Sequence, residues 1–173
     1  QYFTQFSNSR EFINRYKAVE NAVENASKNP VAVKTLVAGL KDPYFRVRMK
    51  ALSGLDLSKP DQAKLALSEV EKLAANDPKT LVQGAAIATL AKTKDKKYLP
   101  LFEKGMNAVS NSVKGNSFSG IASVDPARIT SLADKVDLEG AGEALISELI
   151  PVIVKNKIEK QMPAIATTVA FYP

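Results

Sequence analysis

Apolar side chains recur every three or four residues along most of the chain, which is the spacing of amphipathic helices. Val47, Ala51 and Leu55 follow one another at intervals of four and would form one buried stripe. Short polar segments separate such stretches, and Asp-Pro pairs stand in several of them. This pattern predicts an all-α protein built from helical hairpins with short connections.

Two stretches of the chain, 42–55 and 77–90, resemble each other. They share five positions at a constant offset of 35 residues: Asp42 with Asp77, Pro43 with Pro78, Val47 with Val82, Ala51 with Ala86 and Leu55 with Leu90. A weaker copy, starting near residue 9, lies 33 residues upstream and places Arg15 at the position of Arg48. Self-similarity at such a period is the signature of stacked helical repeats.

Each repeat reads as two helices. The first helices of the hairpins are predicted at 29–40, 59–75 and 96–109. Apolar faces are expected at two sets of positions, Leu36, Val37 and Leu40 in one helix and Leu65, Ala66, Val70, Leu73 and Ala74 in the next. For the second helices, Asp42 and Asp77 are predicted as N-caps with proline at the first helical position.

The period is lost after the second good repeat. The Ser-, Gly- and Asn-rich stretch 110–120 predicts a break, so residues 1–112 are expected to form repeats and 113–173 additional helices packed on the same continuous domain. A helix is predicted at 142–157, with Leu145, Leu149 and Ile153 on one face and a kink at Pro151. The chain starts at Gln1 and ends in an apolar stretch, which suggests a fragment of a longer protein.

Composition narrows the chemistry. The 173 residues include neither His nor Cys, so histidine bases, Ser-His-Asp triads, thiolate nucleophiles and HExxH zinc sites are excluded within this sequence. The longest apolar run, 149–154, is too short to span a bilayer. These absences argue against a self-contained enzyme.

The net charge of +6 is concentrated in the first part of the chain, where residues 1–60 hold ten Lys/Arg and five Asp/Glu. Such an imbalance could attract nucleic acid or an acidic partner. However, the basic residues are dispersed along helical faces without a recognition motif, which favours solvated helix surface over a nucleic-acid site.

Several side chains are candidates for binding. Arg46, Arg48 and Lys50 could grip an anion, but positions two apart do not share a helix face. Tyr44, with Tyr16 and Phe45, could line a recognition groove or fill gaps between repeats. The sequence EGAG at 139–142 and the carboxylate pairs Asp134/Asp137 and Glu143/Glu148 are weaker candidates, favoured as a turn and as solvated surface.

The Asp-Pro-x-x-x-Val-Arg-x-x-Ala pattern at 42–51, repeated from Asp77, resembles the HEAT repeat and implies a superhelical array. In HEAT-like families such an Asp and the Arg six residues later form a ladder between neighbouring repeats, roles that Asp42 and Arg48 would take. Gln83 stands where the second arginine is expected, so the ladder should be weaker there. Loss of the Arg48 side chain is then expected to destabilise the array by about 1–3 kcal/mol.

The order of helices from residue 1 to the second Asp-Pro repeat also resembles the helical region that follows the catalytic domain in M1-type zinc aminopeptidases. The zinc-binding HExxH and the Gly-x-Met-Glu-Asn exopeptidase motif of that family are both missing here. The resemblance therefore implies a non-catalytic C-terminal domain, with no cofactor of its own, that closes or scaffolds a zinc site elsewhere in a longer chain. The alternative is a free-standing HEAT-like scaffold for another protein. Arg46, Lys50 and Tyr44 are the predicted partner-binding residues.

Overall fold

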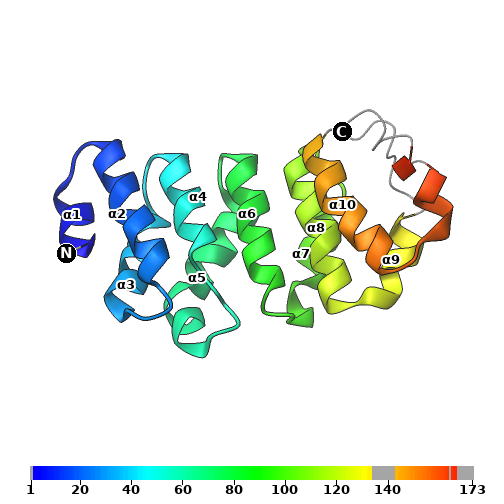
Figure 1. The fold of residues 1–173 in the computed structure, drawn as a ribbon, viewed down its shortest axis with the longest axis horizontal. Helices are drawn as coiled ribbons and strands as arrows, with labels where there is room; N and C mark the ends of the chain where they lie inside the picture. Colours follow the sequence, from blue (N-terminus) through cyan, green and yellow to red (C-terminus); the bar gives the residue numbers. More distant parts are fainter. Residues whose placement is uncertain (1, 134–142, 164, 167–173) are drawn as a thin grey trace. The chain divides into compact units, whose positions relative to one another are not determined.

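The computed structural model describes residues 2–133, 143–163 and 165–166. The described part is all-α, with no strand. Its helices, drawn in Figure 1, are α1 (Tyr2–Asn8), α2 (Phe12–Asn25), α3 (Pro30–Gly39), α4 (Phe45–Ser53), α5 (Pro60–Asn76), α6 (Thr80–Ala91), η1 (Lys96–Tyr98), α7 (Leu99–Gly105), α8 (Asn111–Val124), α9 (Pro126–Ala133), α10 (Glu143–Lys155) and η2 (Glu159–Gln161).

The chain forms two compact units, residues 1–93 and 94–173. The expected division at residue 112 into repeats and appended helices stays a prediction. Within the described residues, no helix combines the length and the apolar character that crossing a membrane requires.

The first unit is built from two sets of helices. Helices α2, α4 and α6 lie side by side, with α2 contacting α4 and α4 contacting α6 (Figure 1). The other set, α1, α3 and α5, makes the equivalent contacts from α1 to α3 and from α3 to α5. Helices α2 with α3 and α5 with α6 pack on one another, so the core of this unit lies between the two sets.

The helices of the first unit follow from the apolar spacing. Val47, Ala51 and Leu55 are at most 1% exposed, which confirms the predicted stripe. Gly39 permits α3 to approach both α2 and α4 closely, since a Cβ at this position would lie 3.0 Å from Val19 and 3.1 Å from Ala51. These small contacts let neighbouring helices pack at short range.

Helices α3 and α5 match the predicted segments to within one residue at each end. Both start with a proline, and the Asn29 side chain accepts a hydrogen bond from Val31 N. One predicted core position is wrong: Leu65 is 48% exposed. Ala66 takes the buried place beside it, because the apolar face of α5 is narrower than the sequence suggested.

The predicted starts of α4 and α6 are also wrong. These helices begin at Phe45 and Thr80, with Tyr44 and Lys79 as N-caps. Asp42 and Asp77 instead accept a bond from the backbone N–H two residues on, at 2.8 Å in each case. This local turn delays the helix by two residues, because each aspartate also binds an arginine from the preceding helix of its set.

In the second unit, α8 packs against α7, α9 and α10. The predicted break at 110–120 is wrong, because residues 111–120 form the first part of α8. Val113, Phe118 and Ile121 fall on its buried side. The glycines that suggested a break have a packing role: a Cβ on Gly120 would lie 2.9–3.0 Å from the Phe102 ring.

The remaining predictions for the second unit are mixed. Helix α10 lies within the predicted range 142–157 and includes Pro151; Leu149 and Ile153 are fully buried. The predicted helix at 96–109 is shorter, divided into η1 and α7. The EGAG stretch, Asp134 and Asp137 lie outside the described residues, as do the side chains of Leu145, Glu143 and Glu148.

Ser117 carries one testable consequence of this packing. Its hydroxyl is buried and has no hydrogen-bond partner within the part of the chain that the structure describes. Ser117→Ala is expected to raise the free energy of unfolding by about 1 kcal/mol, because folding then no longer strips water from a hydroxyl that gains no hydrogen bond in return. Thermal denaturation followed by circular dichroism measures the change.

Thr89 supplies the contrast, because its equally buried hydroxyl donates a 2.8 Å bond to Ala85 O. Thr89→Val is expected to lower the melting temperature, whereas Ser117→Ala raises it or leaves it unchanged. A Ser117→Ala protein that melts well below the native chain would mean that the hydroxyl has a partner.

Candidate functional site

A buried ion pair joins α4 to the start of α6. Arg48 Nε lies 2.7 Å from Asp77 Oδ2, and Arg48 Nη2 lies 2.9 Å from Asp77 Oδ1. The two side chains are 9% and 2% exposed. Arg48 Nη1 also donates to the carbonyl oxygens of Asp42 and Pro43. The guanidinium of Arg48 thus holds both the loop before α4 and the loop before α6.

The same arrangement occurs one repeat earlier. Arg15 of α2 donates to both carboxylate oxygens of Asp42, at 2.6 and 3.2 Å, and to the carbonyl oxygen of Arg10 at 2.7 Å. The hydrogen bond from Arg15 to Asp42 raises the pKa of the guanidinium above its ordinary value. The Arg15 side chain is more accessible than that of Arg48, at 14%.

Gln83 occupies the third equivalent position, in α6. Its Nε2 donates to Asp77 O at 2.7 Å, just as Arg48 Nη1 donates to Asp42 O at 2.8 Å. Gln83 therefore keeps the bond to the loop before its own helix, although an uncharged amide cannot form the ion pair. We call the Arg15–Asp42 and Arg48–Asp77 pairs the arginine ladder. Its assignment to the HEAT family stays a prediction.

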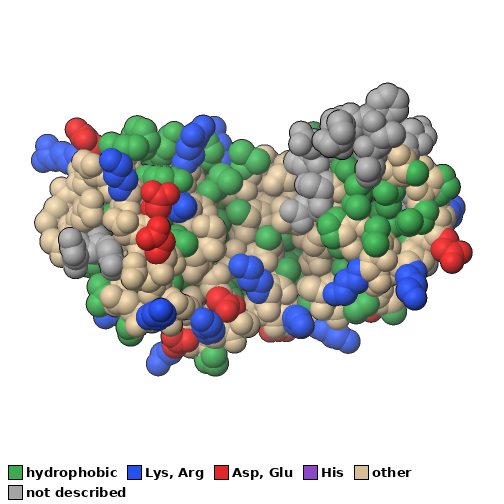
Figure 2. Space-filling model, viewed as in Figure 1, with side chains coloured by type: hydrophobic (Ala, Val, Ile, Leu, Met, Phe, Trp, Pro, Cys, Tyr) green, Lys and Arg blue, Asp and Glu red, His purple; other side chains and the backbone are tan. Residues whose placement is uncertain are grey.

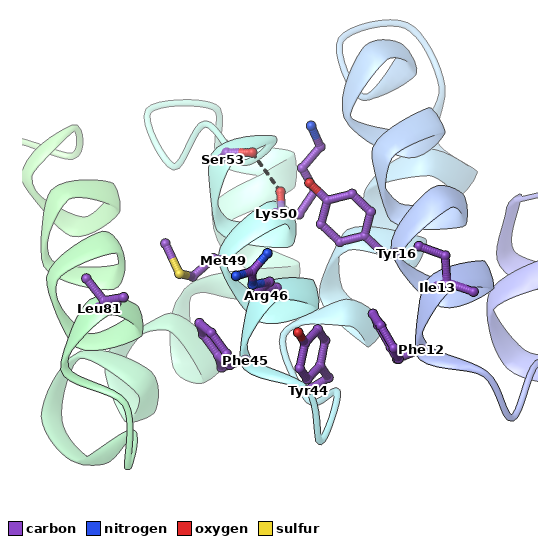
Figure 3. Close-up of a pocket in the computed structure, with 10 residues that line it drawn as sticks. All are labelled: Phe12, Ile13, Tyr16, Tyr44, Phe45, Arg46, Met49, Lys50, Ser53 and Leu81. Carbon is purple, nitrogen blue, oxygen red and sulfur yellow. Dashed lines mark hydrogen bonds between the residues drawn. The ribbon is translucent and has the colours of Figure 1, made fainter.

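A second feature of the first unit is an open hollow on the side of α2, α4 and α6. Its volume is about 810 Å³, and we call it the aromatic groove. Ten side chains line it: Phe12, Ile13, Tyr16, Tyr44, Phe45, Arg46, Met49, Lys50, Ser53 and Leu81 (Figure 3). Seven of them are aromatic or large apolar residues, from α2, α4, α6 and Tyr44 just before α4, and none of the ten is acidic.

The groove keeps large apolar side chains in contact with solvent. Phe12, Ile13 and Leu81 are 47%, 44% and 50% exposed. Figure 2 shows hydrophobic side chains gathered over the upper ends of α2, α4 and α6, with basic side chains next to them. Phe45 and Met49 of α4, which lies between α2 and α6, are partly exposed. Isolated exposed residues are common, but apolar side chains gathered in one open groove are typical of an interaction surface.

The aromatic rings of the groove form a row. The Tyr44 ring lies between those of Phe12 and Phe45, with centroid separations of 4.4 and 5.4 Å (Figure 3). Tyr44 thereby joins α2 to α4, as expected for an aromatic residue that fills the gap between repeats, and it also borders the open space. Tyr44 thus both fills the gap between α2 and α4 and lines the groove.

Cations cluster at the Phe45 end of the row. Arg46 Cζ and Lys79 Nζ each lie 5.9 Å from the centroid of the Phe45 ring. Neither side chain has a carboxylate partner among the described residues. Lys50 differs, because its Nζ lies 3.2 Å from Glu20 Oε1 and 5.9 Å from the Tyr16 ring centroid. Lys50 therefore has an acidic neighbour on α2, whereas Arg46 is exposed, and the partner-binding role of both residues stays a prediction.

Sequence reasoning placed Tyr44, Arg46 and Lys50 near a surface, and the structure brings all three to the same groove. It missed Ile13, Leu81 and Lys79, because single exposed apolar or basic residues on a helix carry no signal. Arg15 was also missed as a ladder residue, although its alignment with Arg48 was a usable signal.

No group of three or more acidic side chains that could hold a metal ion occurs among the described residues. The acidic residues of the first unit serve as ion-pair partners or solvated surface groups. Neither a protein-family model, nor a curated protein, nor a solved structure matches the chain.

Proposed function

We propose that this chain is a HEAT-like helical repeat domain that binds protein through the aromatic groove and has no catalytic centre of its own. The observation that carries the proposal is the set of apolar side chains that line the groove, of which Phe12 and Ile13 of α2 and Leu81 of α6 are exposed and Phe45 and Met49 of α4 are partly exposed. An uncovered apolar surface lowers the solubility of a monomer, and a bound protein would cover it.

The repeat architecture supports the same function. Helices α2, α4 and α6 contact in sequence, and the arginine ladder repeats the same two bonds in successive loops. A superhelix of such hairpins presents the second helices of its repeats as one extended surface, which suits the binding of polypeptides. The absence of His and Cys from the sequence removes the commonest catalytic side chains.

The specific form of the proposal that we favour is the C-terminal helical domain of an M1-like zinc aminopeptidase. In that form the catalytic zinc belongs to another part of a longer chain, and the groove faces that part or the peptide it acts on. The parent reading frame provides the test: an HExxH motif upstream of Gln1 is expected. Without one, the free-standing scaffold is the better form.

Peptide selection tests the groove directly. Peptides selected from a random display library against residues 1–173 are expected to bind the native chain and to lose about tenfold or more in affinity for Ile13→Ser/Leu81→Ser, because hot-spot apolar side chains dominate such contacts. Fluorescence polarisation measures the affinities, and circular dichroism checks that the variant is folded.

Leu65→Ser is the matched control. Leu65 is 48% exposed, close to the 50% of Leu81, but it lies on α5 and does not line the groove. Its replacement should leave peptide affinity unchanged. Equal loss of affinity in the Leu65 variant and in the groove variant would rule out the groove as the binding surface.

A further inference from the structure

The aromatic groove combines two kinds of recognition within a short distance. Phe12 and Ile13 of α2 and Leu81 of α6 offer exposed apolar surface, and Arg46 places a cation beside the Phe45 ring. Lys79, just outside the groove, places a second cation near the same ring. None of the ten side chains that line the groove is acidic. Glu20 pairs with Lys50 near Tyr16, and among the described residues no carboxylate pairs with Arg46 or Lys79.

The two ends of the groove therefore differ in charge. Near Tyr16 the charge of Lys50 is already matched by Glu20, at 3.2 Å. Around Phe45 the two positive charges have no carboxylate partner among the described residues, whereas Arg15 and Arg48 bind aspartates and Lys41 lies 3.7 Å from Glu69. The two cations near one ring leave a local excess of positive charge, which an added carboxylate would offset.

We propose that the groove binds an acidic peptide segment, in which Asp or Glu side chains meet Arg46 and Lys79 while large apolar side chains of the same segment pack on Phe12 and Ile13 at one end of the groove or on Leu81 at the other (Figure 3). This inference rests on the proposed protein-binding function and specifies the partner. Arg46 suits the role because its guanidinium binds a carboxylate with two parallel hydrogen bonds. The hollow of about 810 Å³ is large enough for a few residues of an extended peptide.

Lys79 is held in place for this role by the arginine ladder. Its backbone N–H donates to Asp77 Oδ1 at 2.8 Å, and Asp77 is in turn clamped by Arg48. The side chain itself has no ion-pair partner among the residues that the structure describes, and it reaches toward the Phe45 ring. The ladder thus fixes the backbone that carries one of the two cations.

Matched peptides test the inference. Each carries blocked termini, so that side chains supply its only charges, and the set compares Leu-Glu-Phe-Asp, Leu-Gln-Phe-Asn and Leu-Lys-Phe-Lys centres within the same flanking sequence. The acidic peptide is expected to bind residues 1–173 about tenfold more tightly than the neutral one, and the basic one more weakly still. The advantage of the acidic peptide should shrink as NaCl rises from 50 to 500 mM, roughly by screening alone.

Variants locate the effect. Arg46→Ala/Lys79→Ala is expected to remove most of the preference for the acidic peptide, whereas Lys64→Ala, a solvent-exposed lysine of α5, should keep it. Equal affinity for the acidic and neutral peptides overturns the inference, and so does the absence of binding by all three peptides. A preference that survives loss of Arg46 and Lys79 overturns it as well.

The outcomes separate this inference from the protein-binding function. If peptides selected by display lose affinity for Ile13→Ser/Leu81→Ser but show no preference for acidic residues, the groove is a protein-binding site and the acidic partner is wrong. If the selected peptides bind that variant unchanged, the proposed function itself fails.

Discussion

Arg48→Ala is expected to lower the free energy of unfolding by about 3–5 kcal/mol, because it leaves a buried carboxylate without its partner. Asp77 is 2% exposed and receives two of its hydrogen bonds from Arg48. This is more than the 1–3 kcal/mol that the sequence alone suggested, since the sequence did not show how deeply the pair is buried. Chemical denaturation followed by circular dichroism measures the effect.

Two controls separate the ion pair from general damage to α4. Arg46→Ala removes an exposed arginine two residues away, and its effect should stay within about 0.5 kcal/mol. Arg48→Met/Asp77→Leu removes both charges and should recover much of the loss, because apolar replacements of a buried pair are often tolerated. Coinciding denaturation curves for Arg48→Ala and Arg46→Ala would mean that the pair contributes nothing.

Phe118→Ala is expected to cost about 3–5 kcal/mol, since it empties a large, fully buried position in α8. The result also distinguishes a packed helix at 111–124 from the loop that its composition suggested, because a loop phenylalanine would matter little. Thermal and chemical denaturation of residues 1–173 both report the change.

Val109→Ala is the control for this substitution. Val109 precedes α8 and is 98% exposed, so its truncation should change stability by less than about 0.5 kcal/mol. A Phe118→Ala protein as stable as Val109→Ala would contradict the packing described for α8.

The sequence predicted the helices best where end signals and apolar spacing agreed. Helices α3 and α5 have proline at their first positions and clear apolar faces, and both were located to within one residue. Helices α4 and α6 were placed two residues early, since an aspartate before a proline was read as an N-cap. Its other duty, to bind an arginine from a preceding helix, is invisible in local sequence.

Composition misled the interpretation of α8. Ser, Gly and Asn are typical of loops, yet here Gly115, Ser117 and Gly120 are all buried along one helix. Small side chains favour loops when a helix stands alone, but they permit close contact when another helix packs against it. Tertiary packing between α7 and α8 decided this segment, and single-sequence patterns do not contain it.

The candidate site was only partly predictable. Tyr44 and Arg46 stood out because they occupy variable positions within the repeat motif, and both line the groove. Leu81 and Ile13 did not, because an exposed apolar residue looks the same in sequence as a buried one until the helices are placed. The pairing of Lys50 with Glu20 joins two helices, and their register had to be known first.

The arginine ladder also bears on how the first unit folds. Its two ion pairs link residues only 27 and 29 positions apart along the chain. Loops of this size close with a modest loss of chain entropy, and local contacts of this kind accompany rapid folding. Since each pair joins neighbouring helices, we expect this unit to fold through local contacts, without waiting for distant segments to meet.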